Sequence, residues 1–300
     1  MKIQERTGRD VGSPRQAGGS VGYRPVRIWP GGFTLVEVLV VLVVIGILAS
    51  LLLPVLAKAK SAATGIACGS NTRQIAFGWL LYADDREGRL VPNHPGRNGG
   101  WVSGNLDFYG DNSDNTNRTL LTDPRFAKLG PFIQDPRVFK CPADRSEVPT
   151  RDGRYSRTRS VAMNAAVGTP VGDSEWGTLN GAFRTFREMS QIIGPSPAGL
   201  WVLMDEHPDS IDDARFLVDL SRRGPSGYFH SWPANFHGEG ANVAFADGHI
   251  ERHRWLDGRT RHENKYCGCL SSYAHAGNFT VMPGNVDLGW IQARTSSLSR

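Results

Sequence analysis

An almost unbroken apolar run from Phe33 to Ala57 constrains this chain more than any other stretch of its 300 residues. About 20 apolar helical residues, each rising about 1.5 Å, are enough to cross the hydrocarbon core of a membrane. The run contains one carboxylate, Glu37, and one helix-breaking residue, Pro54. Because a charge at membrane depth is costly, it needs a partner. The run therefore predicts a membrane helix that needs a cationic partner for Glu37 near its start.

Basic side chains precede the apolar run. Residues 1–32 hold six basic and two acidic side chains, and the remainder is nearly neutral, with 28 basic and 27 acidic. A basic flank stays on the cytoplasmic side, so we expect a cytoplasmic N-terminus, a single inner-membrane crossing and an exported, periplasmic C-terminal part. We expect no nucleic-acid partner, because the excess positive charge belongs to the N-terminal tail.

The segment before and into the apolar run, Gly31-Gly32-Phe33-Thr34-Leu35-Val36-Glu37, resembles the processing site of type IV prepilins and type II secretion pseudopilins. The resemblance implies that a prepilin peptidase cuts between Gly32 and Phe33 and, as a methyltransferase, N-methylates Phe33. It also implies that Glu37 meets that new amine on a neighbouring subunit. The implied partners are other pseudopilins or copies of this chain, joined through the N-terminal helix. A plain signal anchor is the alternative.

The resemblance and the residue pattern together predict four regions. Residues 1–32 form a leader that is removed, 33–57 a transmembrane and assembly helix kinked at Pro54, 58–88 its amphipathic continuation, and 89–300 an exported β-rich head. The continuation carries one apolar helical face that we expect to pack on the head, made by Cys68, Ile75, Trp79 and Tyr82. The expected fold class is α+β and pilin-like, with the long helix packed on an antiparallel β-sheet.

Several segments of the head have recognisable local patterns. Arg159–Gly168 and Gly199–Ser210 are typical of strands, and Thr185–Ile192 fits a short helix. Trp290 and Ile291 suggest a last strand. Phe236–Trp255 is typical of a β-hairpin, and its Asp-Gly pair predicts a tight primed turn.

His237, nine intervening residues and then Asp247-Gly248 resemble the H-x9-D-G motif in the C-terminal domain of a group of prepilin-type proteins. Two interpretations of the motif, which spans 237–248, stay open. In one, His237 bonds the hairpin and Asp247 serves the turn. In the other, Asp205, His237 and Asp247, with His249 as a further ligand, form a metal site. Resemblance to type II major pseudopilins, which bind Ca²⁺ in a C-terminal loop, favours Ca²⁺ over zinc.

A second group of oxygen ligands lies in a loop rich in Gly, Asn and Asp. Ca²⁺ prefers such ligands, but turn-forming side chains explain the same composition. The residues are Asp107, Asp111, Asn112 and Asp114.

The four cysteines leave the disulfide pattern open. Cys68 can pair with Cys141, which would close a loop of about 70 residues and stabilise the folded chain. Cys267 with Cys269 is the competing pair, and free thiols are the third alternative.

The chain shows none of the common catalytic signatures, such as G-x-S-x-G, a P-loop or H-E-x-x-H, so we expect no enzyme. The predicted function is a structural subunit of a type II secretion pseudopilus or a related pilus-like filament. The alternative is a membrane-tethered extracytoplasmic protein that binds or processes carbohydrate, using the eight tryptophans and the Asp205, His237 and Asp247 group.

Overall fold

The computed structural model describes residues 32–94, 99–170, 182–222, 226–270 and 281–299. The predicted leader therefore lies outside the described residues except for Gly32. The chain divides into an N-terminal unit that ends at Leu52 and a compact unit from Leu53 to Arg300. Each unit is described by itself below.

Helix α1 (Leu35–Asp85) is continuous and contains Pro54 in its interior. Every large apolar side chain from Phe33 to Val44 is exposed. By length and composition α1 can cross a membrane, as no other helix in the described part of the chain can. In the compact unit α1 turns one face inward: Cys68, Ile75 and Trp79 are buried, as the sequence predicts.

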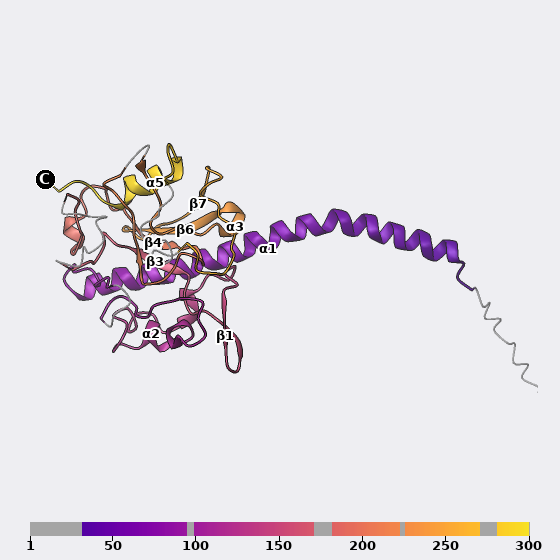
Figure 1. The fold of residues 1–300 in the computed structure, drawn as a ribbon, viewed down its shortest axis with the longest axis horizontal. Coiled ribbons are helices and arrows are strands. Elements are labelled where there is room, and N and C mark those ends of the chain that lie inside the picture. The colour runs from indigo at the N-terminus through magenta and orange to yellow at the C-terminus, as the bar shows by residue number, and fades with distance from the viewer. Residues whose placement is uncertain (1–31, 95–98, 171–181, 223–225, 271–280, 300) are drawn as a thin grey trace, which may run out of the picture. The chain divides into compact units, whose positions relative to one another are not determined.

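The head is organised around a five-stranded sheet with the order β5-β3-β4-β6-β7 (Figure 1). All neighbours are antiparallel except β3 and β5, which are parallel. Strand β4 is buried along its whole length, whereas β7 is largely exposed, as expected of a central and an edge strand. The chain is thus an α+β, pilin-like arrangement. The strands are β3 (Val161–Asn164), β4 (Trp201–Asp205), β5 (Arg215–Phe216), β6 (Gly240–Phe245) and β7 (Ile250–Arg254).

Smaller elements surround the sheet. A separate hairpin pairs β1 (Glu147–Thr150) with β2 (Gly153–Ser156). The predicted helix at 185–192 is a single 3₁₀ turn, η3 (Met189–Gln191). The other short helices are η1 (Ser113–Asn115), α2 (Thr119–Thr122), η2 (Pro136–Phe139) and α3 (Phe236–Glu239).

The predicted last strand around Trp290 and Ile291 is wrong, because these residues lie in helix α5 (Val286–Thr295). Asn285 caps this helix: its side-chain oxygen accepts hydrogen bonds from the backbone N–H groups of Asp287 and Leu288. A short polar cap of this kind starts a helix. Asn285 is thus the residue in the sequence that indicates a helix here, whereas the adjacent apolar residues Trp290 and Ile291 do not distinguish a helix from a strand.

The predicted hairpin is confirmed as β6 and β7, but its turn is not a primed one. A type I′ turn requires positive φ at both central residues, and here only Gly248 has one, at 89°. The backbone N–H of Gly248 donates to the carbonyl of Phe245, and the N–H of Phe245 donates to the carbonyl of His249. The loop therefore has three residues, with Gly248 in the left-handed position.

Candidate functional site

The start of α1 is a reciprocal cap between Thr34 and Glu37. The backbone N–H and the hydroxyl of Thr34 each donate to Oε2 of Glu37 at 2.8 Å, and the N–H of Glu37 donates to the Thr34 hydroxyl at 3.3 Å. This is a capping box, which satisfies N–H groups that the first helical turn leaves free. The second carboxylate oxygen of Glu37 has no part in this cap, so the side chain can cap the helix and still face a cation.

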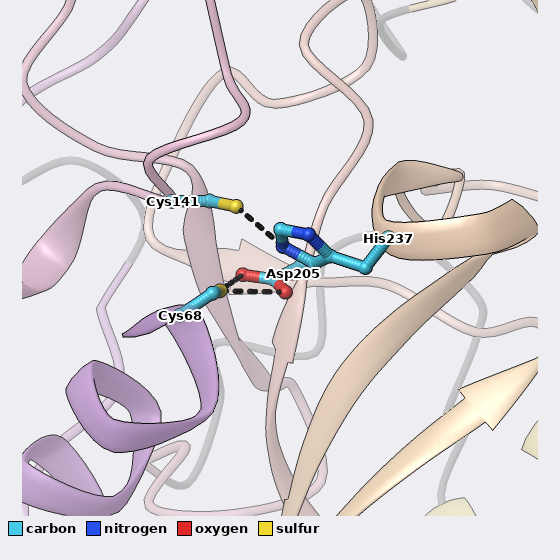
Figure 2. Close-up of side chains that lie close together, drawn as sticks. All are labelled: Cys68, Cys141, Asp205 and His237. Atoms are coloured by element: carbon cyan, nitrogen blue, oxygen red, sulfur yellow. Dashed lines mark hydrogen bonds between the residues drawn. The ribbon is translucent and has the colours of Figure 1, made fainter. Parts of the chain in front are cut away.

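A second site lies inside the compact unit, where four potential ligand side chains meet (Figure 2). Cys68 comes from the buried face of α1, and Cys141 follows η2. Asp205 is the last residue of β4, and His237 lies in α3. All four residues are buried, and one ligand atom from each lies within 4.8 Å of the others. The fold thus gathers residues from four separate segments, which we call the buried cluster.

Short contacts link the residues of the buried cluster in two pairs, Cys68 with Asp205 and Cys141 with His237. The Cys68 thiol donates to the two carboxylate oxygens of Asp205 at 3.4 and 3.2 Å. Sγ of Cys141 lies 2.9 Å from Nε2 of His237. The backbone N–H of Asn242, in β6, donates to Oδ2 of Asp205 at 3.1 Å. The ligand atoms therefore face one another rather than solvent.

Burial disfavours the charged forms of the cluster. It raises the pKa of the Asp205 carboxyl to about 6, and it lowers the pKa of the His237 imidazole, with the positive charge of Arg252 as a second cause. The hydrogen bond between the two thiols is the main cause that raises the pKa of Cys68, and burial raises that of Cys141. Near pH 7 the imidazole and the two thiols are therefore neutral, whereas the Asp205 carboxyl loses its proton above about pH 6.

The metal set expected from sequence needs one correction: Asp247 is not in the cluster. It is exposed at the hairpin turn, where its Oδ1 lies 2.6 Å from Nδ1 of His249, two residues further along the chain. His237 lies against Gly65 of α1. Gly248, the residue that follows Asp247, lies against Leu80 of the same helix. These two helix positions are fifteen residues apart, about 22 Å along the axis. One ion cannot bridge that distance, so Asp247 serves the turn.

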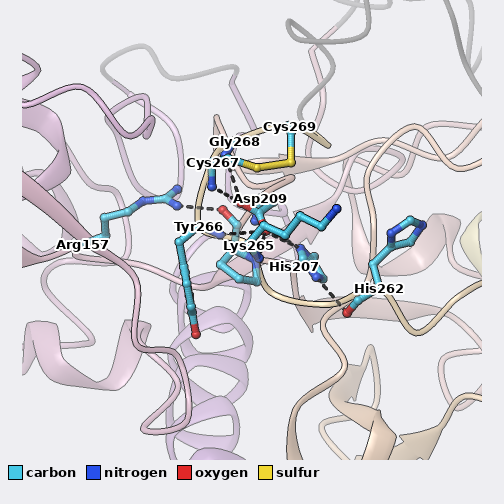
Figure 3. The surroundings of a disulfide bond; sticks show 10 residues. Arg157, His207, Asp209, His262, Lys265, Tyr266, Cys267, Gly268 and Cys269 are labelled. Carbon is cyan, nitrogen blue, oxygen red and sulfur yellow. Dashed lines mark hydrogen bonds and ion pairs between the residues drawn. A yellow bond between two sulfur atoms is a disulfide. The ribbon is translucent and has the colours of Figure 1, made fainter.

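Cys68 and Cys141 are free thiols, so the structure does not contain the first of the two disulfides that the sequence allows. The competing pair, Cys267 and Cys269, is bonded (Figure 3). Asp209 fixes that loop, because its buried carboxylate accepts hydrogen bonds from four successive backbone N–H groups. The donors are those of Lys265, Tyr266, Cys267 and Gly268.

A pocket of about 590 Å³ lies beside the Cys267–Cys269 bond. Its lining includes the aromatic residues Phe108 and Tyr109, together with Ile211 and Asp212. The tryptophans that would support carbohydrate binding do not line it. Trp29 and Trp176 lie outside the described residues, and five of the remaining six are buried: Trp79, Trp101, Trp201, Trp232 and Trp255. Their role is in the core.

Three of the four predicted oxygen ligands of the Gly, Asn and Asp loop bond their own loop: Asp107, Asn112 and Asp114. Oδ1 of Asp107 accepts from the N–H of Tyr109, and Oδ2 accepts from the Asn112 side chain. Asp114 accepts from the N–H of Asn105. These are Asx-type contacts that shape turns, and Ca²⁺ binding stays a prediction.

Comparison with known proteins gives a result for the start of α1. Residues 31–53 match the prokaryotic N-terminal methylation motif. This chain carries a prepilin-type motif. The match covers the predicted cleavage junction, the capping box and the exposed apolar part of α1, but not the head. No curated protein and no solved structure matches the chain.

Proposed function

We propose that this chain is a pilin-like subunit of a type II secretion pseudopilus or a related pilus-like filament. The observation that carries the proposal is the methylation motif at residues 31–53, placed on a helix whose apolar side chains are exposed. An exposed apolar surface of this length needs a membrane or neighbouring helices to cover it. In a subunit that moves from the membrane to a filament, lipid covers this surface first and neighbouring helices cover it afterwards.

Processing by a prepilin peptidase prepares the helix for assembly. Cleavage between Gly32 and Phe33 leaves a new amine on Phe33, four residues before Glu37, the last member of the Thr34–Glu37 cap. Glu37 keeps one carboxylate oxygen outside its own cap. We propose that this oxygen pairs with the amine of Phe33 on a neighbouring subunit, since a charge in an apolar setting is stable only when paired.

The proposed location follows from the same segment. The N-terminus lies in the cytoplasm, α1 crosses the inner membrane once, and the head lies in the periplasm until the subunit joins a filament. The implied partners are the prepilin peptidase, which also methylates Phe33, and other pseudopilins or copies of this chain. The role is structural: five of the six tryptophans in the described residues, which the carbohydrate alternative would need, are buried in the core of the head.

Mass spectrometry of the mature N-terminus tests processing. We expect the chain isolated from membranes to begin at N-methylated Phe33. A mature chain that begins elsewhere, or retains residues 1–32, would contradict the proposal.

Cysteine crosslinking tests assembly. Single cysteines placed at successive positions from Val38 to Leu53 should give ladders of oligomers, with a yield that repeats about every 3.6 residues as one helix face meets a neighbour. The native thiols give little background, because Cys68 and Cys141 are buried and the other two are bonded. A cysteine at exposed Leu256, on the head, is the control for random collision. Equal yields at all positions would refute a defined filament interface.

A further inference from the structure

The buried cluster has the composition of a transition-metal site. Its four ligand atoms are two cysteine sulfurs, one imidazole nitrogen and one carboxylate oxygen (Figure 2). Two thiolates and an imidazole suit Zn²⁺, which is borderline soft, whereas Ca²⁺ prefers an all-oxygen shell. The calcium expectation from resemblance therefore does not apply to these four residues.

The spacing of the ligand atoms fits four-coordinate zinc. Zinc bonds of about 2.0–2.3 Å at tetrahedral angles place ligand atoms about 3.3–3.8 Å apart. The Cys68 sulfur lies 3.2 and 3.4 Å from the Asp205 oxygens, and all four ligand atoms fall within 4.8 Å of one another. The 2.9 Å contact between Cys141 and His237 needs to open by only about half an ångström to reach the tetrahedral spacing.

A charge argument points the same way. Asp205 is completely buried, and its hydrogen-bond partners in the described ranges are all neutral: the Cys68 thiol and the backbone and side-chain amides of Asn242. A buried carboxylate is stable when it is paired with a cation or coordinates a metal. A divalent ion at the centre of the cluster would supply the missing positive charge.

The backbone around His237 is also unusual. His237 itself has φ 52° and ψ 49°, and Gly238 follows at φ 80°. A left-handed conformation in a residue other than glycine costs free energy and is kept where the surroundings require it. Here it turns the imidazole toward Cys141 at the point where α3 enters β6.

From these observations we infer that Cys68, Cys141, Asp205 and His237 bind one structural zinc ion. The ion would join α1 to three segments of the head, so the helix that carries the methylation motif is fastened to the folded domain by coordination bonds. The inference concerns the compact unit alone and holds whether or not the chain joins a filament.

Metal analysis of the full chain tests the inference. The protein is purified in detergent from cells grown with zinc, beside Cys68→Ser, which lacks a ligand, and Asp247→Asn, which changes an aspartate of the H-x9-D-G motif that lies outside the buried cluster. We expect about one zinc per chain in the wild type and in Asp247→Asn, and a loss of at least about tenfold in Cys68→Ser.

Cobalt substitution gives a second readout. Co²⁺ in the same protein should show the visible bands of a tetrahedral site and thiolate charge-transfer absorption, which weakens in Cys141→Ser. If Cys68→Ser fails to fold, as judged by circular dichroism, His237→Gln takes its place with the same expected loss of zinc. Zinc content unaffected by the ligand variants would overturn the inference. So would a metal-free wild type with Cys68 and Cys141 joined in a disulfide.

Discussion

Gly65 of α1 lies directly against the imidazole of His237. A methyl group on Gly65 would lie 3.3 Å from both Cβ and Cγ of that side chain. This spacing is close to the lower limit of ordinary contacts, so the absence of a side chain at position 65 lets α3 approach the helix. The histidine of the H-x9-D-G motif thus lies at the joint between the long helix and the head.

Three glycines of α1 should respond differently to alanine. At Gly69 the added methyl group would have an ordinary contact of 3.6 Å with Asn242, whereas at Gly78 it would lie 2.6 Å from Ile133. Alanine favours helix by about 0.5–1 kcal/mol over glycine, while overpacking a core costs about 1–3 kcal/mol. We expect Gly69→Ala to stabilise the head, Gly78→Ala to destabilise it, and Gly65→Ala to fall between them.

Urea unfolding followed by fluorescence of the buried tryptophans measures this order. Gly69→Ala is the matched control, since it changes the same helix by the same atom. Equal effects of the three substitutions would mean that helix propensity alone decides, and that the close approach at Gly78 has no energetic consequence.

The helix and the hairpin were predictable because their signals are local. An apolar run, the spacing of Cys68, Ile75 and Trp79, and an Asp-Gly pair each act within one or two turns of chain. The buried cluster was not predictable in full. Asp205 and His237 were expected to share a site, and Cys68 was paired with Cys141 only as a possible disulfide. No local pattern joins these two pairs, because their residues come from four segments that only the folded chain brings together.

Asp209 should control the loop that contains Cys267 and Cys269. Its two carboxylate oxygens accept four backbone hydrogen bonds, and the single side-chain oxygen of Asn cannot replace both. We expect Asp209→Asn to weaken the loop by about 1–3 kcal/mol, and amide hydrogen exchange at residues 265–268 to speed up by about tenfold or more.

The control for this substitution is Asp135→Asn. Asp135 also bonds a neighbouring backbone N–H, but its ion pair with Arg137 is exposed, so its loss should change stability much less than Asp209→Asn does. Unchanged exchange at residues 265–268 in Asp209→Asn would show that the disulfide alone fixes the loop.

Asp213 gives the stability of the head a dependence on pH. Burial is the main cause that raises its pKa from 3.8 to about 6, with the charge of Asp212 second. Between these values the folded state holds a proton that the unfolded state has lost, so stability falls as the pH rises through this window. Asp213→Asn cannot ionise. We expect the stability of the wild type relative to this variant to fall by about 1–3 kcal/mol between pH 4 and pH 7.

Urea midpoints of the two proteins across that pH range provide the measurement. The difference between them is the relevant quantity, because groups that do not interact with Asp213 titrate equally in both. A constant difference from pH 4 to pH 7 would contradict a raised pKa for Asp213 in the folded head.

Glu37 offers the sharpest test of assembly, because its two proposed roles can be separated. As a cap it needs only an oxygen that accepts from Thr34, which Gln also supplies; as the partner of the Phe33 amine it needs its charge. We expect Glu37→Gln to be cleaved normally but to reduce the crosslinked ladder at least about tenfold, because Gln cannot supply the negative charge. Thr34→Val removes the capping hydroxyl and keeps the carboxylate, so its ladder should stay near that of the wild type. If Thr34→Val lost the ladder and Glu37→Gln kept it, Glu37 would act on its own helix and the pairing between subunits would be refuted.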